Sequence, residues 1–396
     1  MDFKYVSLCQ EPSLPAPCLD ARRTGMTVFG EEKNVDPIQM VLNRSPNPGA
    51  KMSLDSVRAQ FAKTTPVPIV SGDPRDRPMG KWLAGLHSRP DTALIGIPFD
   101  GATVVPSRKG AAGGPAAVRE SLGDLNCYSI PLDIDISEVL SGSDFGDIPI
   151  QQEDSVADVH ERVSEVLKSV LREGVVPVTM GGDDSLCFAA ARALCRAVKG
   201  RVGVVGFDAH LDMRVLYNLE SSSGSSYRRM FDELDGQIRP SNTVHIGGNG
   251  WFAAKEYGDY ARSKGVTLIT ADDVYERGIE KVMKEAIAKA SNGTEAIYVN
   301  FDMDVLDQHY APGKVMRNPG GLRGRDAYRA ARLLGEHPKV RFFALNEVNV
   351  KRDVSSFTSL VGASVMAYFW AGLAFRKMKS TPSRRAKPKS RAARKR

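Results

Sequence analysis

Short apolar runs alternate with amphipathic stretches along most of the chain. The apolar runs predict strands at 92–97, 175–180, 202–207, 243–247, 266–270, 296–301 and 340–345. Helical spacing predicts helices near 115–122, 156–173, 185–198, 252–264, 278–291, 325–335 and 356–374. Continuous apolar strands are covered on both faces, and strands that alternate with helices form parallel sheets. The pattern therefore predicts one doubly wound α/β domain over residues 90–375.

The two ends of the chain lack this pattern. Residues 1–89 are rich in proline, serine and charge, so we expect a largely irregular N-terminal extension. Residues 376–396 contain many basic residues and two prolines, which predicts a disordered basic tail.

The uncharged stretch 357–375 is open to two interpretations. It is long enough for a membrane-anchoring helix, and basic residues follow it. However, Gly362, Ser364 and Gly372 dilute its apolar character, and an α/β protein buries this kind of helix against its sheet. We predict a buried helix and no membrane partner.

The charge of the chain is concentrated in its tail. The formal net charge is +7, but residues 377–396 hold ten basic residues and no acidic one, so subtracting ten leaves −3 for the rest. A mildly acidic body argues against nucleic-acid binding through the folded domain. The tail is predicted to be solvated, with nuclear targeting as the alternative.

The five cysteines are odd in number and show no CxxC spacing. This argues against a disulfide framework and against a zinc–cysteine site. No secretory signal is visible within residues 1–30, so we expect a cytoplasmic protein.

Acidic residues gather where two predicted strands end. Asp208, His210 and Asp212 follow the strand 202–207, and Asp302 and Asp304 follow the strand 296–301. Side chains two residues apart in an extended segment share a face, and open α/β sheets place their sites at the carboxyl ends of strands. Clustered carboxylates repel unless a cation lies among them, and oxygen ligands with one imidazole suit Mn²⁺ or Mg²⁺. Either motif alone could be a solvated loop, but the pair predicts a two-metal site.

A third polar segment, Gly181-Gly182-Asp183-Asp184-Ser185, also follows a predicted strand. The glycines allow a tight turn from strand to helix. Asp184 or Ser185 could simply cap the next helix, and this motif alone does not favour metal binding over helix capping.

Together, the segments GGDDS (181–185), DAHLD (208–212) and NFDMDVLDQHYAPG (300–313) resemble the signature motifs of the arginase/agmatinase (ureohydrolase) superfamily, GGDHS, DAHxD and SxDxDxxDPxxAPG. The resemblance implies a single three-layer αβα domain with an eight-stranded parallel sheet, assembly into trimers or hexamers, and two Mn²⁺ ions. It implies that Asp208 and Asp302 bridge both ions and that His210 and Asp304 complete one of them. Asp212 would bind the other ion and hold the bridging hydroxide.

Within the superfamily, the chain is most similar to formiminoglutamases. DAHLDMR (208–214), SSSGSSYRRM (221–230) and the stretch 245–266 carry this similarity. It implies that a metal-bound hydroxide attacks the formimino carbon of N-formimino-L-glutamate and yields L-glutamate and formamide. Glu347 would contact the amidine-like nitrogens. Arg214, with Arg108 or Arg228, would hold a substrate carboxylate, because guanidinium groups pair well with carboxylates.

Several positions depart from the family motifs. Asp184 replaces the histidine of GGDHS, Asn300 replaces the serine of SxDxD, Gln308 replaces a proline, and Val350 replaces the proline of EVNP. A short carboxylate at Asp184 predicts one labile Mn²⁺ ion. When that ion is absent, we expect Asp184 either to be protonated or to turn away and cap the following helix. Two alternatives stay open. One is a hydrolase of agmatine or another guanidino compound, and the other is a metal-poor, catalytically weak homologue that acts as a binding or assembly protein.

Overall fold

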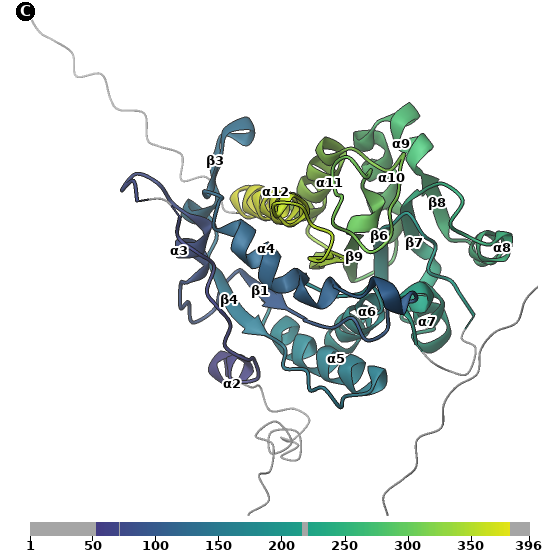
Figure 1. Cartoon of the computed structure of the whole chain (residues 1–396), viewed down its shortest axis with the longest axis horizontal. Coiled ribbons are helices and arrows are strands. Elements are labelled where there is room, and N and C mark those ends of the chain that lie inside the picture. The colour runs from purple at the N-terminus through teal and green to yellow at the C-terminus, as the bar shows by residue number, and fades with distance from the viewer. Residues whose placement is uncertain (1–52, 71, 216–220, 381–396) are drawn as a thin grey trace, which may run out of the picture. The chain divides into compact units, whose positions relative to one another are not determined.

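A central sheet organises the computed structural model, which describes residues 53–70, 72–215 and 221–380 (Figure 1). The eight strands have the order β4-β1-β5-β10-β9-β6-β7-β8, and every neighbouring pair is parallel. In chain order they are β1 Thr92–Gly96, β4 Gly142–Asp147, β5 Val176–Met180, β6 Val202–Phe207, β7 Ile238–Gly248, β8 Thr267–Thr270, β9 Ala296–Asp302 and β10 Val340–Asn346. The predicted eight-stranded parallel sheet is confirmed.

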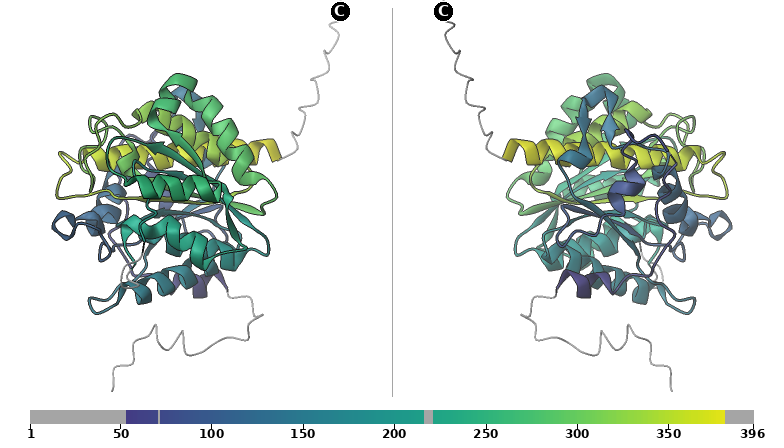
Figure 2. Two further views of the ribbon diagram at one scale, coloured as in Figure 1. Left: turned by 90° about the vertical axis from the view of Figure 1, so that its right-hand side faces the viewer. Right: turned by 90° about the vertical axis from the view of Figure 1, so that its left-hand side faces the viewer.

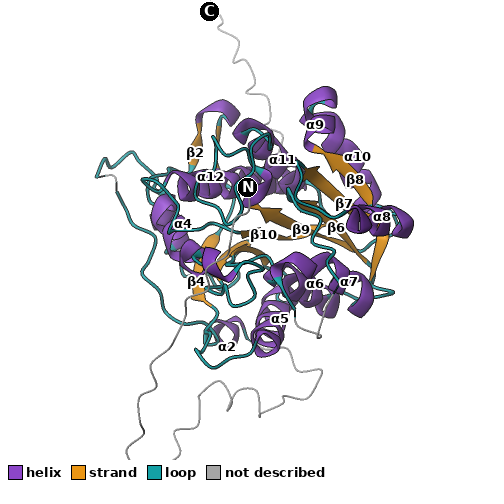
Figure 3. Cartoon of the chain, turned by 45° about the vertical axis from the view of Figure 1, so that its right-hand side comes forward, coloured by secondary structure: helices purple, strands orange, loops and turns teal. Residues whose placement is uncertain are grey.

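Helices cover both faces of this sheet, as Figures 2 and 3 show. One apolar cluster lies between the sheet and a first layer, formed by α4 Gly114–Leu122, α9 Ala271–Arg277, α10 Ile279–Ser291, α11 Gly324–Glu336 and α12 Phe357–Ser380. A second cluster lies under α5 Val156–Arg172, α6 Leu186–Ala197, α7 Ser226–Glu233 and α8 Lys255–Lys264. Alternate side chains of a strand enter opposite clusters, so Leu94 packs in the first and Ile95 in the second. The fold is therefore the predicted three-layer αβα arrangement.

The edge strand β4 was missed because its sequence, GSDFGD, carries no apolar run. It pairs with β1, and Asp147 at its end forms an isolated antiparallel bridge with Ala62. Asp144 forms a bidentate ion pair with the buried Arg119. A tertiary ion pair therefore replaces the hydrophobic pattern that identified the other strands. The helices α7 and α9 were also missed, because each is short.

Part of the predicted N-terminal extension packs against the folded body. Residues 53–89 are largely irregular, with the short helices α2 Leu54–Arg58 and α3 Met79–Leu83. Yet Val57, Met79 and Trp82 are buried in the two clusters. The Trp82 ring meets Trp370 of α12 edge-to-face, with centroids 5.2 Å apart. Residues 1–52 and 381–396, including most of the predicted extension and tail, lie outside the described residues.

Helix α12 is the one described helix that is long and apolar enough to cross a membrane by length and composition alone. However, 72% of its most apolar window is buried inside the body, where Val365, Phe369 and Trp370 pack in the first cluster. This burial agrees with the predicted core helix. The helix continues to Ser380, so the predicted tail from residue 376 starts as helix.

Candidate metal centre

Four neighbouring strands in the middle of the sheet, β5, β10, β9 and β6, deliver the polar motifs. The segment 181–185 follows β5, Glu347 follows β10, Asp302 ends β9, and Asp208 follows β6. All four strands are parallel, so their carboxyl ends lie at one edge of the sheet. Segments far apart in the sequence thus meet at a single site.

The predicted ligands lie close enough to share metal ions. Ligand oxygens of Asp184, Asp208 and Asp212 all lie within 4.8 Å of one another. His210 Nδ1 lies 3.2 Å from Asp208 Oδ1 and 3.9 Å from Asp304 Oδ2. The two groups share Asp208, as expected if this residue bridges two ions.

The hydrogen bonding of the cluster leaves room for cations. Backbone amides already bind Asp208 Oδ1 (from His210, 2.7 Å), Asp302 Oδ1 (from Asp304, 2.5 Å) and Asp304 Oδ1 (from Met316, 3.2 Å). In contrast, Asp184 Oδ2, Asp208 Oδ2 and Glu347 Oε2 are buried without a hydrogen-bond partner among the described residues. Buried carboxylate oxygens need a partner, and a hard divalent cation supplies one. The aspartates of the cluster, together with His210, fit two Mn²⁺ ions.

Burial dominates the protonation of the cluster. It raises the pKa of Asp208, Asp212 and Asp302 well above the usual range, and neighbouring carboxylates raise each further. Burial also raises the pKa of Asp184 to about 7. The metal-free protein therefore retains protons here that a cation would displace.

Asp184 does not turn away to cap the following helix, and its raised pKa agrees instead with the other expected state, in which it is protonated. No side chain caps α6, which begins after Ser185. Instead, Asp184 Oδ1 accepts hydrogen bonds from the amide groups of Asn300 and Asn346, at 2.8 and 2.9 Å. Its backbone amide donates to Glu347 Oε1 at 2.7 Å.

The backbone around the cluster is tightly constrained. Asp212 and Glu347 adopt left-handed conformations, with φ of 48° and 69°. Such conformations cost free energy in non-glycine residues and often occur at functional sites. At Gly182, a Cβ atom would lie 1.6 Å from the carbonyl oxygen of Phe99, so only glycine fits there. This close approach holds the loop that carries Asp184.

Arg108 lies beside the cluster. It follows β1 in a 3-10 helix, Pro106–Arg108, and its side chain is half-buried. Its guanidinium contacts the sulfur of Met316, whose backbone amide binds Asp304. The positive charge of Arg108 is one of those that oppose the rise of the Asp304 pKa caused by burial.

The other two predicted substrate arginines have different surroundings. Arg214, two residues after Asp212, is exposed, packs over Gly224, and lies 5.7 Å from the ring centroid of Tyr257. Arg228 binds Asp232 at 2.9 Å and lies over the ring of Tyr260. Arg214 is thus open to a ligand, whereas Arg228 is already engaged.

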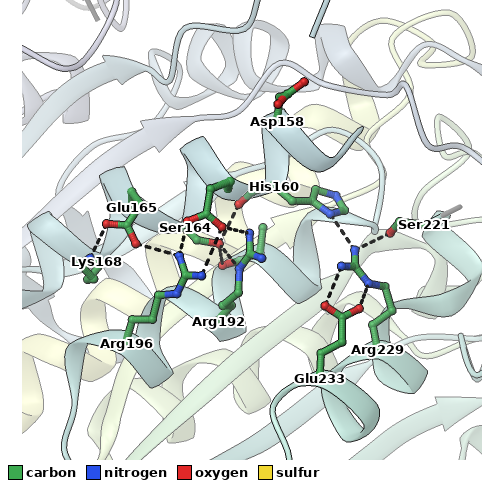
Figure 4. A network of polar contacts seen from close by, with 12 residues as sticks. Asp158, His160, Ser164, Glu165, Lys168, Arg192, Arg196, Ser221, Arg229 and Glu233 are labelled. Carbon is green, nitrogen blue, oxygen red and sulfur yellow. Dashed lines mark hydrogen bonds and ion pairs between the residues drawn. The ribbon is translucent and has the colours of Figure 1, made fainter. Parts of the chain in front are cut away.

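A polar network around His160 and Arg229, shown in Figure 4, was missed from the sequence. Arg229 contacts His160 Nδ1 at 3.0 Å and also binds Ser221 and Glu233. His160 Nε2 lies 3.0 Å from the hydroxyl of Ser185, which donates to Asp183. Burial lowers the pKa of His160 to about 3, so the ring is neutral and accepts from Arg229 while donating to Ser185. Arg229 is therefore a structural residue.

Lys314 is a second residue that the sequence did not single out. It is completely buried, and its ammonium donates to the backbone carbonyls of Asp304, at 3.1 Å, and Leu306. Its charge opposes the rise in the Asp304 pKa. Its position directly after the motif 300–313 was a signal that could have marked it.

Known proteins are similar to this chain in both sequence and fold. The model of the arginase family matches residues 90–371. The formimidoylglutamase of Halobacterium salinarum is 32% identical over 319 residues, which cover 79% of this chain and 99% of that protein. The crystal structure of Bacillus subtilis formimidoylglutamase gives a TM-score of 0.72 at 26% identity, covering 81% of this chain and 99% of that one. Trypanosoma cruzi formiminoglutamase, solved with Mn²⁺, gives 0.71 at 26% identity, covering 76% and 99%.

Proposed function

Because the chain belongs to the arginase family, we propose that it is a manganese-dependent hydrolase that cleaves N-formimino-L-glutamate to L-glutamate and formamide. The observation that carries this proposal is the set of converging buried carboxylate oxygens that have no hydrogen-bond partner among the described residues. The similarity to formimidoylglutamases, which spans 99% of the length of two such proteins, supports the choice of substrate. A protein that used the fold only for assembly would gain nothing from a cluster of buried carboxylates that repel one another.

The reaction adds water across one C–N bond. When bound, the Mn²⁺ pair lowers the pKa of a coordinated water, which supplies a nucleophile near neutral pH. Asp208 and Asp302 would bridge the ions, His210 and Asp304 would complete one, and Asp184 and Asp212 the other. Asp212 would also accept a hydrogen bond from the attacking water. Attack at the formimino carbon breaks its bond to the glutamate nitrogen, which leaves with a proton as the amine.

Glu347 is placed to orient the substrate. Its Oε1 is held by the backbone amide of Asp184, and its Oε2 has no described partner. Oε2 would accept a hydrogen bond from a formimino N–H and so align the reactive carbon with the nucleophile.

Arginines near the cluster favour an anionic substrate. Formiminoglutamate bears two carboxylates, whereas agmatine is a cation that positive charges would repel. Arg108 beside Asp304 and the exposed Arg214 are the better-placed carboxylate partners, and Arg228 is the third candidate. A guanidino acid would satisfy the same arginines, so it is the alternative substrate class.

Replacing either arginine should weaken substrate binding. Arg108→Leu and Arg214→Leu should each raise KM for formiminoglutamate by roughly 30-fold, or ~2 kcal/mol, because a carboxylate loses its partner. Arg228→Leu should change KM less, since Asp232 and Tyr260 already hold this side chain. The matched control is Arg262→Leu, which replaces an exposed arginine of α8 paired with Asp259. If KM for Arg108→Leu and Arg214→Leu is unchanged, as expected for the control, neither arginine binds the substrate carboxylate.

A substrate panel tests the function itself. The Mn²⁺-loaded protein is mixed with formiminoglutamate, agmatine and guanidino acids, and the products are followed by proton NMR. We expect formamide and glutamate from the first compound at the highest kcat/KM. Turnover of only a guanidino compound would select the alternative hydrolase, and no turnover despite bound Mn²⁺ would favour the binding or assembly protein. Trimers or hexamers, testable by sedimentation, and a cytoplasmic location remain predictions.

A further inference from the structure

Two departures from the family motifs meet in the structure. Asp184 stands where GGDHS has histidine, and Asn300 stands where SxDxD has serine. Although they are 116 residues apart in the sequence, the amide of Asn300 donates to Asp184 Oδ1 at 2.8 Å. Both side chains are buried, with 1% and 0% exposure, so solvent cannot replace this contact.

The orientation of the Asn300 amide is determined by its other contacts. Its Oδ1 accepts from Asn346 Nδ2 at 2.9 Å and from the Tyr298 hydroxyl at 3.3 Å. The Nδ2 group must therefore face Asp184. If the amide were rotated, its NH₂ group would point at the NH₂ group of Asn346, and its oxygen would point at the Asp184 carboxylate. Asn346 Nδ2 also donates to Asp184 Oδ1, at 2.9 Å. Asn346 is itself confined, since its Oδ1 lies 1.9 Å from where Gly181 would carry a Cβ.

This arrangement leaves Asp184 with one free oxygen. Both amides bind Oδ1, whereas Oδ2 has no described hydrogen-bond partner, and a ligand oxygen of Asp184 lies within 4.8 Å of those of Asp208 and Asp212. Neighbouring hydrogen bonds orient metal ligands and tune their affinity. A carboxylate needs donors behind it, whereas an imidazole bound to a metal needs an acceptor for its remaining N–H. Two amide N–H groups therefore suit aspartate at this position.

We propose that Asn300, supported by Asn346, is a positioning residue that makes Asp184 a competent one-oxygen Mn²⁺ ligand, so that aspartate and asparagine together replace histidine and serine. Aspartate is shorter than histidine and asparagine is longer than serine, so the exchange roughly conserves buried volume. The inference rests on the metal site of the proposed function but not on its substrate. Asp184 should then bind its Mn²⁺ ion firmly. Replacing Asp184 alone with histidine should weaken the binding of that ion.

The test is a double-mutant cycle on Mn²⁺ affinity, measured by calorimetric titration of the full chain after removal of metal with EDTA. Asn300→Ser should weaken binding of one Mn²⁺ about 10- to 100-fold, as expected for loss of a supporting hydrogen bond. Asp184→His should also weaken it, because the larger ring meets two amide donors. The double variant Asp184→His/Asn300→Ser should bind more tightly than either single variant. Circular dichroism of the metal-free proteins establishes that each is folded.

Asn300→Asp is the matched control, since it keeps the shape of the side chain but replaces the donor with an oxygen that repels Asp184. It should weaken Mn²⁺ binding at least as much as Asn300→Ser, and it decides the question if the histidine variants do not fold. Wild-type affinity in Asn300→Ser, or simple additivity in the double variant, would overturn the proposal. Because the readout is Mn²⁺ affinity, a failure of the substrate assay leaves this result interpretable.

Discussion

Asp302→Ala should abolish Mn²⁺ binding and hydrolysis together. Asp302 ends β9 in the middle of the sheet, is 2% exposed, and is the proposed bridge between the two ions. Loss of a bridging carboxylate removes a ligand from both ions at once, so neither site keeps its coordination. We expect kcat/KM to fall by at least about 10,000-fold, which corresponds to ~5 kcal/mol or more of lost transition-state stabilisation.

The measurement is Mn²⁺ content per chain after dialysis, by mass spectrometry, alongside turnover of formiminoglutamate. Asp302→Asn is a gentler companion variant, because its oxygen can still accept the hydrogen bond from the Asp304 amide. Asp235→Ala, in an exposed turn after α7, should retain both metal and activity. Full metal content in Asp302→Ala would show that Asp302 is not a bridging ligand.

The metal-free protein should lose stability as the pH rises from about 4 to 7, and Mn²⁺ should remove most of this dependence. The pKa of Asp184 is raised to about 7 from an ordinary value of 3.8, and that of Asp183 to about 6, with burial as the main cause. A raised carboxylate pKa means that the folded state binds protons more tightly than the unfolded state. Its contribution is therefore fully present below pH 3.8 and is lost as the pH passes the folded value.

For Asp184 alone, a rise of about three pKa units corresponds to ~4 kcal/mol. Bound Mn²⁺ replaces the proton and removes the cost of burying the charge. Urea unfolding at pH 4.5, 6.0 and 7.5, with EDTA or with Mn²⁺, measures the effect. Asp184→Asn, which cannot ionise, should make the EDTA curve less steep, while the other buried carboxylates of the cluster keep part of the slope. The same slope in EDTA for wild type and Asp184→Asn would rule out Asp184 as its source.

The local sequence was sufficient for most of the fold. Seven strands, all except β4, contain an apolar run, and a stretch that is buried on both faces must be apolar. The carboxyl ends of parallel strands share one edge, so residues such as Asp208 and Asp302 could be placed together before their distances were known. β4 was not predicted because its sequence contains no apolar run, and in this chain the ion pair between Arg119 and Asp144 helps to hold this edge strand.

What the sequence alone determined is therefore the αβα architecture and the identity of the carboxylate cluster, because both follow from periodicity and strand ends. Only the tertiary structure decided how Asp184 is oriented, that Arg229 binds His160, and that Lys314 lies beneath Asp304. The orientation of Asp184 and the contact between Arg229 and His160 depend on side chains from separate elements. A buried hydrogen bond of this kind leaves no periodic pattern along the sequence. The sequence showed Asp184 and Asn300 as two separate departures, and folding made them partners because their strands end at the same edge of the sheet.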